Sequence, residues 1–300
     1  MPIPWPRGRG LTVGIAALLV LTATPAAPAV PVTVPPAPPT APAGPARVLT
    51  LITGDRVTVT GGVGAETVLS VTDPHGPVQH PRLLSDNGTS GQGPFRAGDN
   101  ISTSVMTAWG DSGGHAGVVW ADSDTSRISL YQGGELLGED VNERIVTVGG
   151  LSPDPKPYRL VLEGSRNLPD RPYSTRTRTV WDFTSATTDP TRLTPLPLVQ
   201  LDYAVDADLS GRAHRRTELT VTASHLKGAA GAGPIRTATV EVSYDDGATW
   251  HRTALRKSAD GWTARLDAPG KARYASLRTT TKDTEGNGVG QTLIRAFGLR

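Results

Sequence analysis

Ser112 lies in the sequence Gly110-Asp111-Ser112-Gly113-Gly114, the part of the chain whose residues best fit the surroundings of a nucleophilic serine. A serine in a glycine-rich turn can attack a carbonyl carbon when a histidine takes its proton and a buried carboxylate orients that histidine. The two upstream histidines, His75 and His80, lie in a proline-rich stretch that has no strand pattern around it. We therefore expect a polar turn between strands at this motif.

The five residues match the signature around the nucleophile of chymotrypsin-like peptidases, which supply the histidine and the aspartate from an upstream barrel. The chain has no room for that barrel. Gly88-Thr89-Ser90 is similar to the nucleophile motif of subtilisins, and Asp111-Ser112-Gly113 to their aspartate motif. Subtilisins carry these groups in the order Asp, His, Ser, whereas the serine-like motif comes first here. His115 also lacks the His-Gly-Thr-His pattern, so we assign no catalytic residue.

Two further motifs carry carboxylates in turns. Ser243-Tyr244-Asp245-Asp246-Gly247-Ala248-Thr249-Trp250 fits the Asp-box pattern of sialidase propellers, but a propeller needs several copies and the chain has one. We predict a tight hairpin inside a sandwich. Asp283-Thr284-Glu285-Gly286-Asn287 predicts a turn that gathers too few oxygens for a specific calcium site. We assign no metal ligand and no cofactor.

Tryptophans are the other residues with a potential binding role. In a protein without disulfides, tryptophans at this density usually anchor the core, and a carbohydrate-stacking surface is the alternative. The residues concerned are Trp109, Trp120, Trp181, Trp250 and Trp262.

The first 29 residues have the pattern of a signal peptide. Arg7 and Arg9 form a positive region, Leu11 to Ala23 is apolar, and Ala27-Pro28-Ala29 offers small residues for cleavage. The apolar run is shorter than the ~20 residues that a membrane-spanning helix needs, and no later segment is apolar enough to span. We expect an exported, extracellular, soluble protein without a membrane span.

The composition narrows the classes of partner. There is no cysteine, so neither a disulfide nor a thiolate contributes. The net charge of +2 and the scattered arginines argue against nucleic acid as a partner. Only five of the 30 basic residues are lysine, and with abundant Ala, Gly and Pro this bias indicates a GC-rich bacterial genome.

The elements that must position these residues are short strands. Residues 30–46 form a Pro/Ala-rich linker, and residues 47–98 hold a hairpin followed by a loose segment rich in Pro and Gly. From Ile101 onward apolar residues alternate with polar ones, and no amphipathic helix is found. The pattern is clearest in five groups of apolar residues that recur at every second position. These groups are Ile128 and Leu130; Tyr158, Leu160 and Leu162; Leu219, Val221 and Ala223; Ala238, Val240, Val242 and Tyr244; and Trp262, Ala264 and Leu266.

Alternation with period two and one apolar face is typical of antiparallel strands packed against a second sheet. A boundary near Thr187-Thr188-Asp189-Pro190 leaves about seven strands on each side. We therefore predict an all-β fold with two antiparallel sandwiches, residues 99–188 and residues 195–300, of immunoglobulin-like or jelly-roll-like type. The second sandwich has the cleaner pattern and is expected to be immunoglobulin-like.

Two parts of the chain resemble the secreted subtilisin-like serine peptidases of Streptomyces and related actinobacteria. Residues 49–59 (LTLITGDRVTV) resemble the start of their propeptide. A longer match resembles the sandwich region that follows their catalytic domain. It runs through residues 115–117, 129–139, 197–203, 208–212, 242–247 and 291–299 and spans about two-thirds of the chain.

The resemblance implies a peptidase lineage without peptidase activity, because some forty residues stand where the family carries its catalytic domain. We expect a secreted, non-catalytic accessory or interaction module whose partner is a secreted protein, a peptidase or a cell-wall polymer. One alternative is an internally deleted peptidase remnant without a role of its own. Others are a carbohydrate- or cell-wall-binding module and, with the least support, a sandwich enzyme with an unrecognised site.

Overall fold

The computed structural model describes residues 47–50, 56–60, 68–72, 78–83, 93–103, 106–113, 124–142, 145–167, 172–208, 210–259 and 261–300. All of them belong to the compact unit Ala41–Arg300. The expected signal peptide and the whole of the expected linker lie outside the described residues. Throughout the described part the secondary structure consists of strands, which confirms the all-β prediction. No helix in that part is long and apolar enough to cross a membrane.

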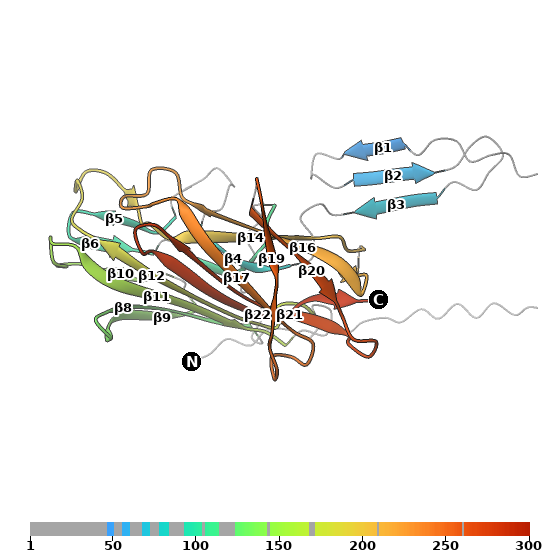
Figure 1. The fold of residues 1–300 in the computed structure, drawn as a ribbon. Coiled ribbons are helices and arrows are strands. Elements are labelled where there is room, and N and C mark those ends of the chain that lie inside the picture. Colours follow the sequence, from blue (N-terminus) through green and yellow to red (C-terminus); the bar gives the residue numbers. More distant parts are fainter. Residues whose placement is uncertain are drawn as a thin grey trace, which may run out of the picture. The chain divides into compact units, whose positions relative to one another are not determined.

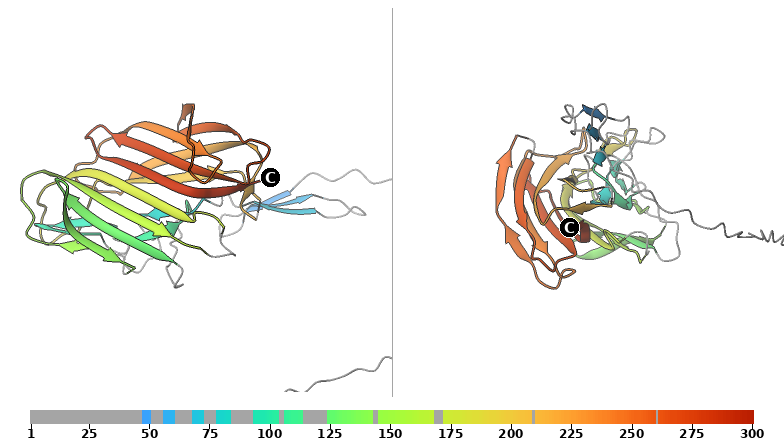
Figure 2. Two further views of the ribbon diagram at one scale, coloured as in Figure 1. Left: turned by 90° about the horizontal axis from the view of Figure 1, so that it is seen from below. Right: turned by 90° about the vertical axis from the view of Figure 1, so that its right-hand side faces the viewer.

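A nine-stranded sheet is the largest element of the fold (Figures 1 and 2). Its strands follow the order β18-β17-β21-β22-β12-β11-β8-β9, and β15 pairs in parallel with β22. Their bounds are β8 Thr125–Gln132, β9 Glu135–Val141, β11 Lys156–Ser165, β12 Arg176–Ser185, β15 Arg212–Ala213, β17 Ile235–Ser243, β18 His251–Thr253, β21 Tyr274–Asp283 and β22 Gly288–Leu299.

Four smaller sheets complete the described fold. One joins β10 (Thr147–Val148), β6 (Asn100–Ser102), β5 (Phe95–Ala97) and β13 (Thr194–Pro195), and another joins β14 (Val199–Val205), β16 (Arg216–His225), β20 (Gly261–Asp267) and β19 (Leu255–Ser258). The third pairs β4 (His80–Arg82) with β7 (Thr107–Gly110), and the fourth holds β1 (Arg47–Thr50), β2 (Arg56–Thr60) and β3 (Val68–Thr72).

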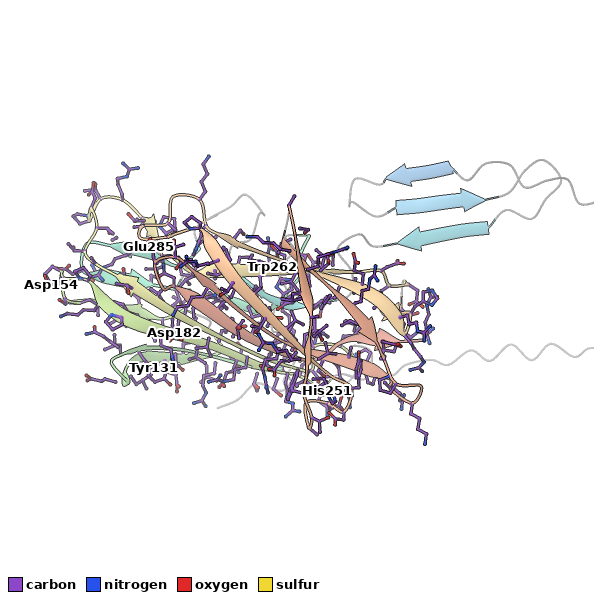
Figure 3. All side chains as sticks on the ribbon, viewed as in Figure 1. Tyr131, Asp154, Asp182, His251, Trp262 and Glu285 are labelled. Carbon is purple, nitrogen blue, oxygen red and sulfur yellow. The ribbon has the colours of Figure 1, made fainter. Side chains whose placement is uncertain are left out.

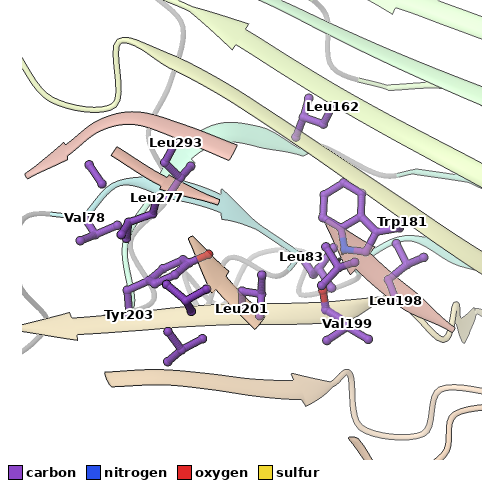
Figure 4. Packing of buried hydrophobic residues seen from close by; sticks show 14 of the residues in the cluster. Val78, Leu83, Leu162, Trp181, Leu198, Val199, Leu201, Tyr203, Leu277 and Leu293 are labelled. Carbon is purple, nitrogen blue, oxygen red and sulfur yellow. Dashed lines mark hydrogen bonds between the residues drawn. The ribbon is translucent and has the colours of Figure 1, made fainter. Parts of the chain in front are cut away.

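One face of the nine-stranded sheet carries the core. The indole nitrogen of Trp181 on β12 donates a hydrogen bond to the carbonyl oxygen of Val199 on β14, at 2.8 Å. At another point the buried Arg96 guanidinium on β5 lies 3.4 Å from the hydroxyl of Tyr158 on β11. Figure 4 shows Trp181 close to Val199, with Tyr203 further along the same strand. The sheets of β14 and β5 therefore both contact this inner face, as the layers of a sandwich do.

The alternating residues of the sequence occupy strands with their apolar members inside. Leu160 and Leu162 on β11 and Leu219 and Val221 on β16 are fully buried, whereas Arg159, which precedes Leu160, is exposed. Alternation of this kind needs only a strand and a covered face, which explains why it can be detected in the sequence alone.

The boundary expected near residues 187–190 is not confirmed. Strand β12, from the first expected sandwich, pairs antiparallel with β22, from the second, over Arg176–Asp182. This pairing makes one sheet out of strands that we expected in two domains. Between residues 47 and 98, β1 and β2 pair antiparallel where a hairpin was expected, and β3 adds a third strand. The segment expected to be loose contributes β4, β5 and the buried Val78 and Leu83.

Candidate functional site

Strand pairing brings His80 to the Gly110–Gly114 motif. In the antiparallel pair β4–β7, His80 lies opposite Gly110, and Ser112 follows two residues later. No sequence pattern indicates this pair, because β4 is three residues long and contains Pro81, which disrupts any alternating pattern.

The hydroxyl of Ser112 lies between the His80 ring and the backbone of Tyr203. The Nε2 atom of His80 is 3.1 Å from Ser112 Oγ. The same Oγ accepts a hydrogen bond from the amide of Tyr203 at 2.8 Å and lies 2.9 Å from the carbonyl oxygen of Tyr203. The serine proton therefore has two acceptors within reach, and one of them is main chain of β14.

The His80 ring is neutral at physiological pH. Its Nδ1 lies 3.1 Å from the carbonyl oxygen of Pro81, and because a carbonyl only accepts, this contact places the proton on Nδ1. The pKa of His80 is lowered to about 4, chiefly by complete burial and also by nearby Arg82, against the raising effects of the Pro81 carbonyl and Asp111. A neutral ring with its proton on Nδ1 presents the Nε2 lone pair to Ser112.

The carboxylate near this pair is not placed as in a serine peptidase. Asp202 Oδ1 is 3.9 Å from His80 Nε2, the nitrogen that also faces Ser112, and Asp202 forms an ion pair with Arg82. In a catalytic triad the carboxylate accepts from Nδ1. Asp111 accepts a hydrogen bond from the Gly113 amide at 2.8 Å. The motif thus forms a hydrogen-bonded turn attached to β14, with His80 beneath it.

The other residues of the peptidase-like motifs lie outside the described residues. They are Gly88-Thr89-Ser90, His75, His115 and Gly114. The expectations for these residues therefore stay predictions.

A second candidate site is a hollow on the outer face of the nine-stranded sheet. This outer hollow has a volume of about 840 Å³ and is lined by residues of β8, β11, β12, β22 and β21 and of the 243–250 hairpin. Four arginines and two carboxylates line it: Arg127, Arg176, Arg178, Arg278, Glu163 and Asp246. A neighbouring hollow of about 620 Å³ shares Arg127, Glu163 and Arg178, and its other members include Tyr131 and Asp182, labelled in Figure 3.

The strand register aligns these side chains in a charged row. Glu163 lies opposite both Arg127 and Arg178, Thr292 lies opposite both Arg178 and Arg278, and Glu241 lies opposite both Arg278 and Arg252. Residues directly opposite in antiparallel strands have Cβ atoms about 5 Å apart, so the row runs across the sheet as adjacent neighbours. We call these seven residues the charged row.

Most arginines around the outer hollow are neutralised by a carboxylate. Arg178 Nε is 2.8 Å from Glu163 Oε1, and Arg278 Nη1 is 3.3 Å from Glu241 Oε2. Arg127 pairs likewise with Glu139 at 3.2 Å. These are exposed or half-exposed pairs, each worth less than about 1 kcal/mol of stability, and so they can exchange partners.

The Asp-box hairpin forms a wall of the outer hollow. Asp245 accepts hydrogen bonds from the amide and hydroxyl of Thr249, at 2.9 and 2.6 Å, and from the hydroxyl of Ser243 at 2.7 Å. The bonds from Thr249, followed by the one from Ser243, lower the pKa of Asp245 to about 2. Asp246 forms two bonds of 2.9 and 2.7 Å to Arg295 of β22. The predicted tight hairpin is therefore present, and it is attached to the sheet beside the hollow.

Gly247 allows this hairpin to lie close to the sheet. Its φ of 90° favours glycine, and a Cβ atom there would come within 2.8 Å of Ile294 on β22 and 3.3 Å of Trp250. The Arg278 guanidinium lies over the Trp250 ring, 4.2 Å from its centroid, so one ring face is already covered.

The tryptophans in the described part of the chain do not form a common stacking surface. Trp109, Trp181 and Trp262 are buried, and Trp120 lies outside the described residues. The indole of Trp109 donates to the carbonyl oxygen of Ser174, as buried indoles usually require a partner. Among the described tryptophans, Trp250 alone lines the outer hollow.

The turn that follows β21 has a structural role. Asp283 accepts bonds from the Asn287 amide and side chain, at 2.8 and 2.7 Å, and from the Gly233 amide at 3.0 Å. Burial acts to raise the pKa of Asp283, but these bonds and nearby His225 hold it below its usual value. The carboxylate oxygens are thus occupied by protein donors.

Sequence reasoning named Asp246, Gly247 and Trp250 but missed the arginines around them. Each strand shows one polar face without indicating which strands are neighbours, and the charged row exists only because β12 pairs with β22. In comparisons with known proteins, no protein-family model and no curated protein matches the chain.

Proposed function

We propose that this chain is a secreted β-sandwich protein that acts by binding a partner and not by catalysis. The observation that carries the proposal is the outer hollow, about 840 Å³ in volume and lined by charged side chains on one sheet face. Binding sites of this size are concave and carry a few polar groups at fixed positions. Here the β-strands fix the positions of the polar groups, since neighbouring strands of one sheet supply most of the lining side chains.

The proposal includes a lineage from the accessory regions of actinobacterial subtilisin-like serine peptidases. It is supported by the resemblance of residues 115–299 to the sandwich region of those enzymes and by the signal-peptide pattern of residues 1–29. The partner classes remain a secreted protein, a peptidase or a cell-wall polymer.

The non-catalytic part of the proposal is supported by the position of Ser112. Its Oγ is bonded to the amide of Tyr203, and the carboxylate of Asp202 lies on the same side of the His80 ring as the serine. An activated serine needs its base oriented by a third group on the opposite ring nitrogen.

The deciding experiment combines an activity probe with a binding assay. The full chain is expressed for export, purified from the medium and treated with a fluorophosphonate serine-hydrolase probe, beside Ser112→Ala and Ser90→Ala variants. We expect no labelling of the folded protein. Labelling that is lost in one serine variant would overturn the non-catalytic assignment.

The binding arm measures saturable retention of the purified protein on secreted proteins and on purified cell-wall material. Saturable retention by one of the two supports the binding function. Retention by neither, together with rapid proteolysis in the medium, favours the deleted remnant and sinks the proposal.

A further inference from the structure

We propose that the outer hollow binds an extended acidic segment of a partner polypeptide, with carboxylates at alternate positions along the segment. The inference rests on the proposed binding function and identifies its ligand chemistry. Four arginines line the hollow, three of them are ion-paired to a carboxylate, and the fourth, Arg176, leaves a positive charge that is complementary to an anion.

Arg176 has a guanidinium group that is available to a carboxylate of the ligand. It is exposed on β12 and lines the hollow. Within the described part of the chain its side chain makes no hydrogen bond or ion pair, although it lies close enough to Asp246 to add to the effect of Arg295, which lowers the pKa of that carboxyl. A guanidinium without a partner can take a carboxylate through two parallel hydrogen bonds.

Arg178 and Arg278 are the neighbouring arginines that bind further carboxylates of the ligand. They flank Thr292 in the charged row, and no carboxylate stands between them as Glu163 stands between Arg127 and Arg178. Each holds its own carboxylate through one contact within 3.5 Å, Arg178 to Glu163 and Arg278 to Glu241, so donors remain for a ligand.

The spacing favours an extended peptide. Arg176 and Arg178 lie two residues apart on one strand and face the same side, which places their Cα atoms about 6.8 Å apart. Alternate side chains of an extended peptide repeat at the same distance. A segment lying along β12 therefore presents a carboxylate to each arginine, with Ile294 and Thr292 beside them on the neighbouring strand β22.

The 243–250 hairpin limits the hollow at one side. Asp246 is already bonded to Arg295, which keeps its charge from neutralising Arg176 completely. Gly247 and Trp250 contribute non-acidic surface to the wall. An anionic glycan could also be attracted by the arginines, but three described tryptophans are buried and the ring of Trp250 is covered on one face by Arg278.

The test uses the full chain exported to the medium and a fluorescent peptide with glutamate at every second position. The control peptide has the same composition with its glutamates in one block. We expect saturable binding of the alternating peptide, weaker binding of the block peptide, and loss of affinity as salt rises. Arg176→Gln and Arg278→Gln are each expected to weaken binding about tenfold, as the loss of a charge-assisted bond does.

Arg216→Gln is the matched control, because Arg216 is an exposed, ion-paired arginine on β16, outside the outer hollow. It removes the same charge and is expected to leave the affinity unchanged. Equal weakening by Arg216→Gln, or equal binding of both peptides, would show a general charge effect and overturn the inference. Stronger competition by polygalacturonate than by the alternating peptide would assign the hollow to a glycan instead.

The outcomes separate this inference from the proposed function. If neither peptide binds while retention on secreted proteins or cell-wall material persists, the ligand assignment fails and the binding function stands. If peptide binding and retention are both absent, both fail.

Discussion

The Nε2 atom of His80 lies 3.1 Å from the Oγ atom of Ser112, although the two residues are 32 positions apart. The pair resembles a base beside its nucleophile, but the surroundings give it a structural function. His80 is completely buried, and Ser112 joins the turn after β7 to the backbone of Tyr203 on β14. A buried neutral histidine has a direct consequence for stability.

Stability is expected to fall as the pH falls from about 6.5 to about 4. The folded protein holds the pKa of His80 at about 4, below the ordinary histidine value of 6.5, so the unfolded chain binds the proton first. Above pH 6.5 neither state is protonated and the folded state keeps its full stability. Between pH 7 and pH 4.5 this linkage amounts to about 2.5 kcal/mol.

Urea unfolding at pH 7 and pH 4.5 measures the effect against a His80→Gln variant. Glutamine can still donate a hydrogen bond but does not titrate, so the variant is expected to lose about 2.5 kcal/mol less than the wild type over this range. Identical losses in both proteins would contradict the assignment of a buried neutral His80.

Ser112→Ala is expected to destabilise the protein by about 1–3 kcal/mol. The substitution leaves the amide of Tyr203 without its acceptor at 2.8 Å, and an unsatisfied buried group costs that amount. Ser258→Ala on the exposed end of β19 is the control and is expected to change the free energy of unfolding by less than about 0.5 kcal/mol. Equal effects of the two substitutions in chemical denaturation would refute this role of Ser112.

The strands could be predicted from the sequence wherever one face is covered. Tyr158, Leu160 and Leu162 recur at every second position and are buried on β11, so the all-β fold followed from period two. The short β4 could not be found in this way, because three residues including a proline carry no period.

Which strands lie side by side in the sheet could not be predicted from the sequence. Arg178 and Thr292 are polar residues of two ordinary strands, and only the pairing of β12 with β22 sets them side by side. The boundary expected near residues 187–190, with about seven strands on each side, suggested separate domains, whereas hydrogen bonding between β12 and β22 joins the two sides. The charged row therefore became visible only in the folded protein, while the hairpin with Asp245 could be predicted because its contacts are local.

Asp245→Ala is expected to loosen the hairpin that forms the wall of the outer hollow. The substitution removes the acceptor for the amide and hydroxyl of Thr249 and for the hydroxyl of Ser243. Hydrogen exchange of residues 243–250 is expected to become faster, because these bonds hold the turn locally. Asp189→Ala, which removes a similar bond to the amide of Thr191, is expected to leave the exchange of residues 243–250 unchanged. Unchanged exchange in Asp245→Ala itself would contradict the role of the hairpin.

Residues 93–300 are expected to unfold in one transition. Strand β12 pairs with β22 over seven residues, so neither half of the sheet keeps its hydrogen bonds when the other unfolds. Calorimetry should give equal calorimetric and van't Hoff enthalpies for this part of the chain. Two separate transitions, or a folded fragment that ends at Pro190, would instead indicate two independent sandwiches.

Gln291 is expected to be the polar residue that most strongly couples the layers at this junction. Its side chain on β22 accepts from the hydroxyl of Tyr203 on β14 at 2.9 Å and donates to the hydroxyl of Thr179 on β12 at 3.0 Å. All three residues are buried, so Gln291→Leu leaves two hydroxyls without this partner and should cost about 1–3 kcal/mol.

A double-mutant cycle separates this coupling from the change in packing. Tyr203→Phe removes the hydroxyl that Gln291 accepts from, so its effect should be smaller when Gln291→Leu is already present. An interaction free energy of about 0.5 kcal/mol or more, measured by urea unfolding, supports a hydrogen bond that holds β14 to β22. Strict additivity of the two substitutions would mean that the sheets are joined here by apolar packing alone.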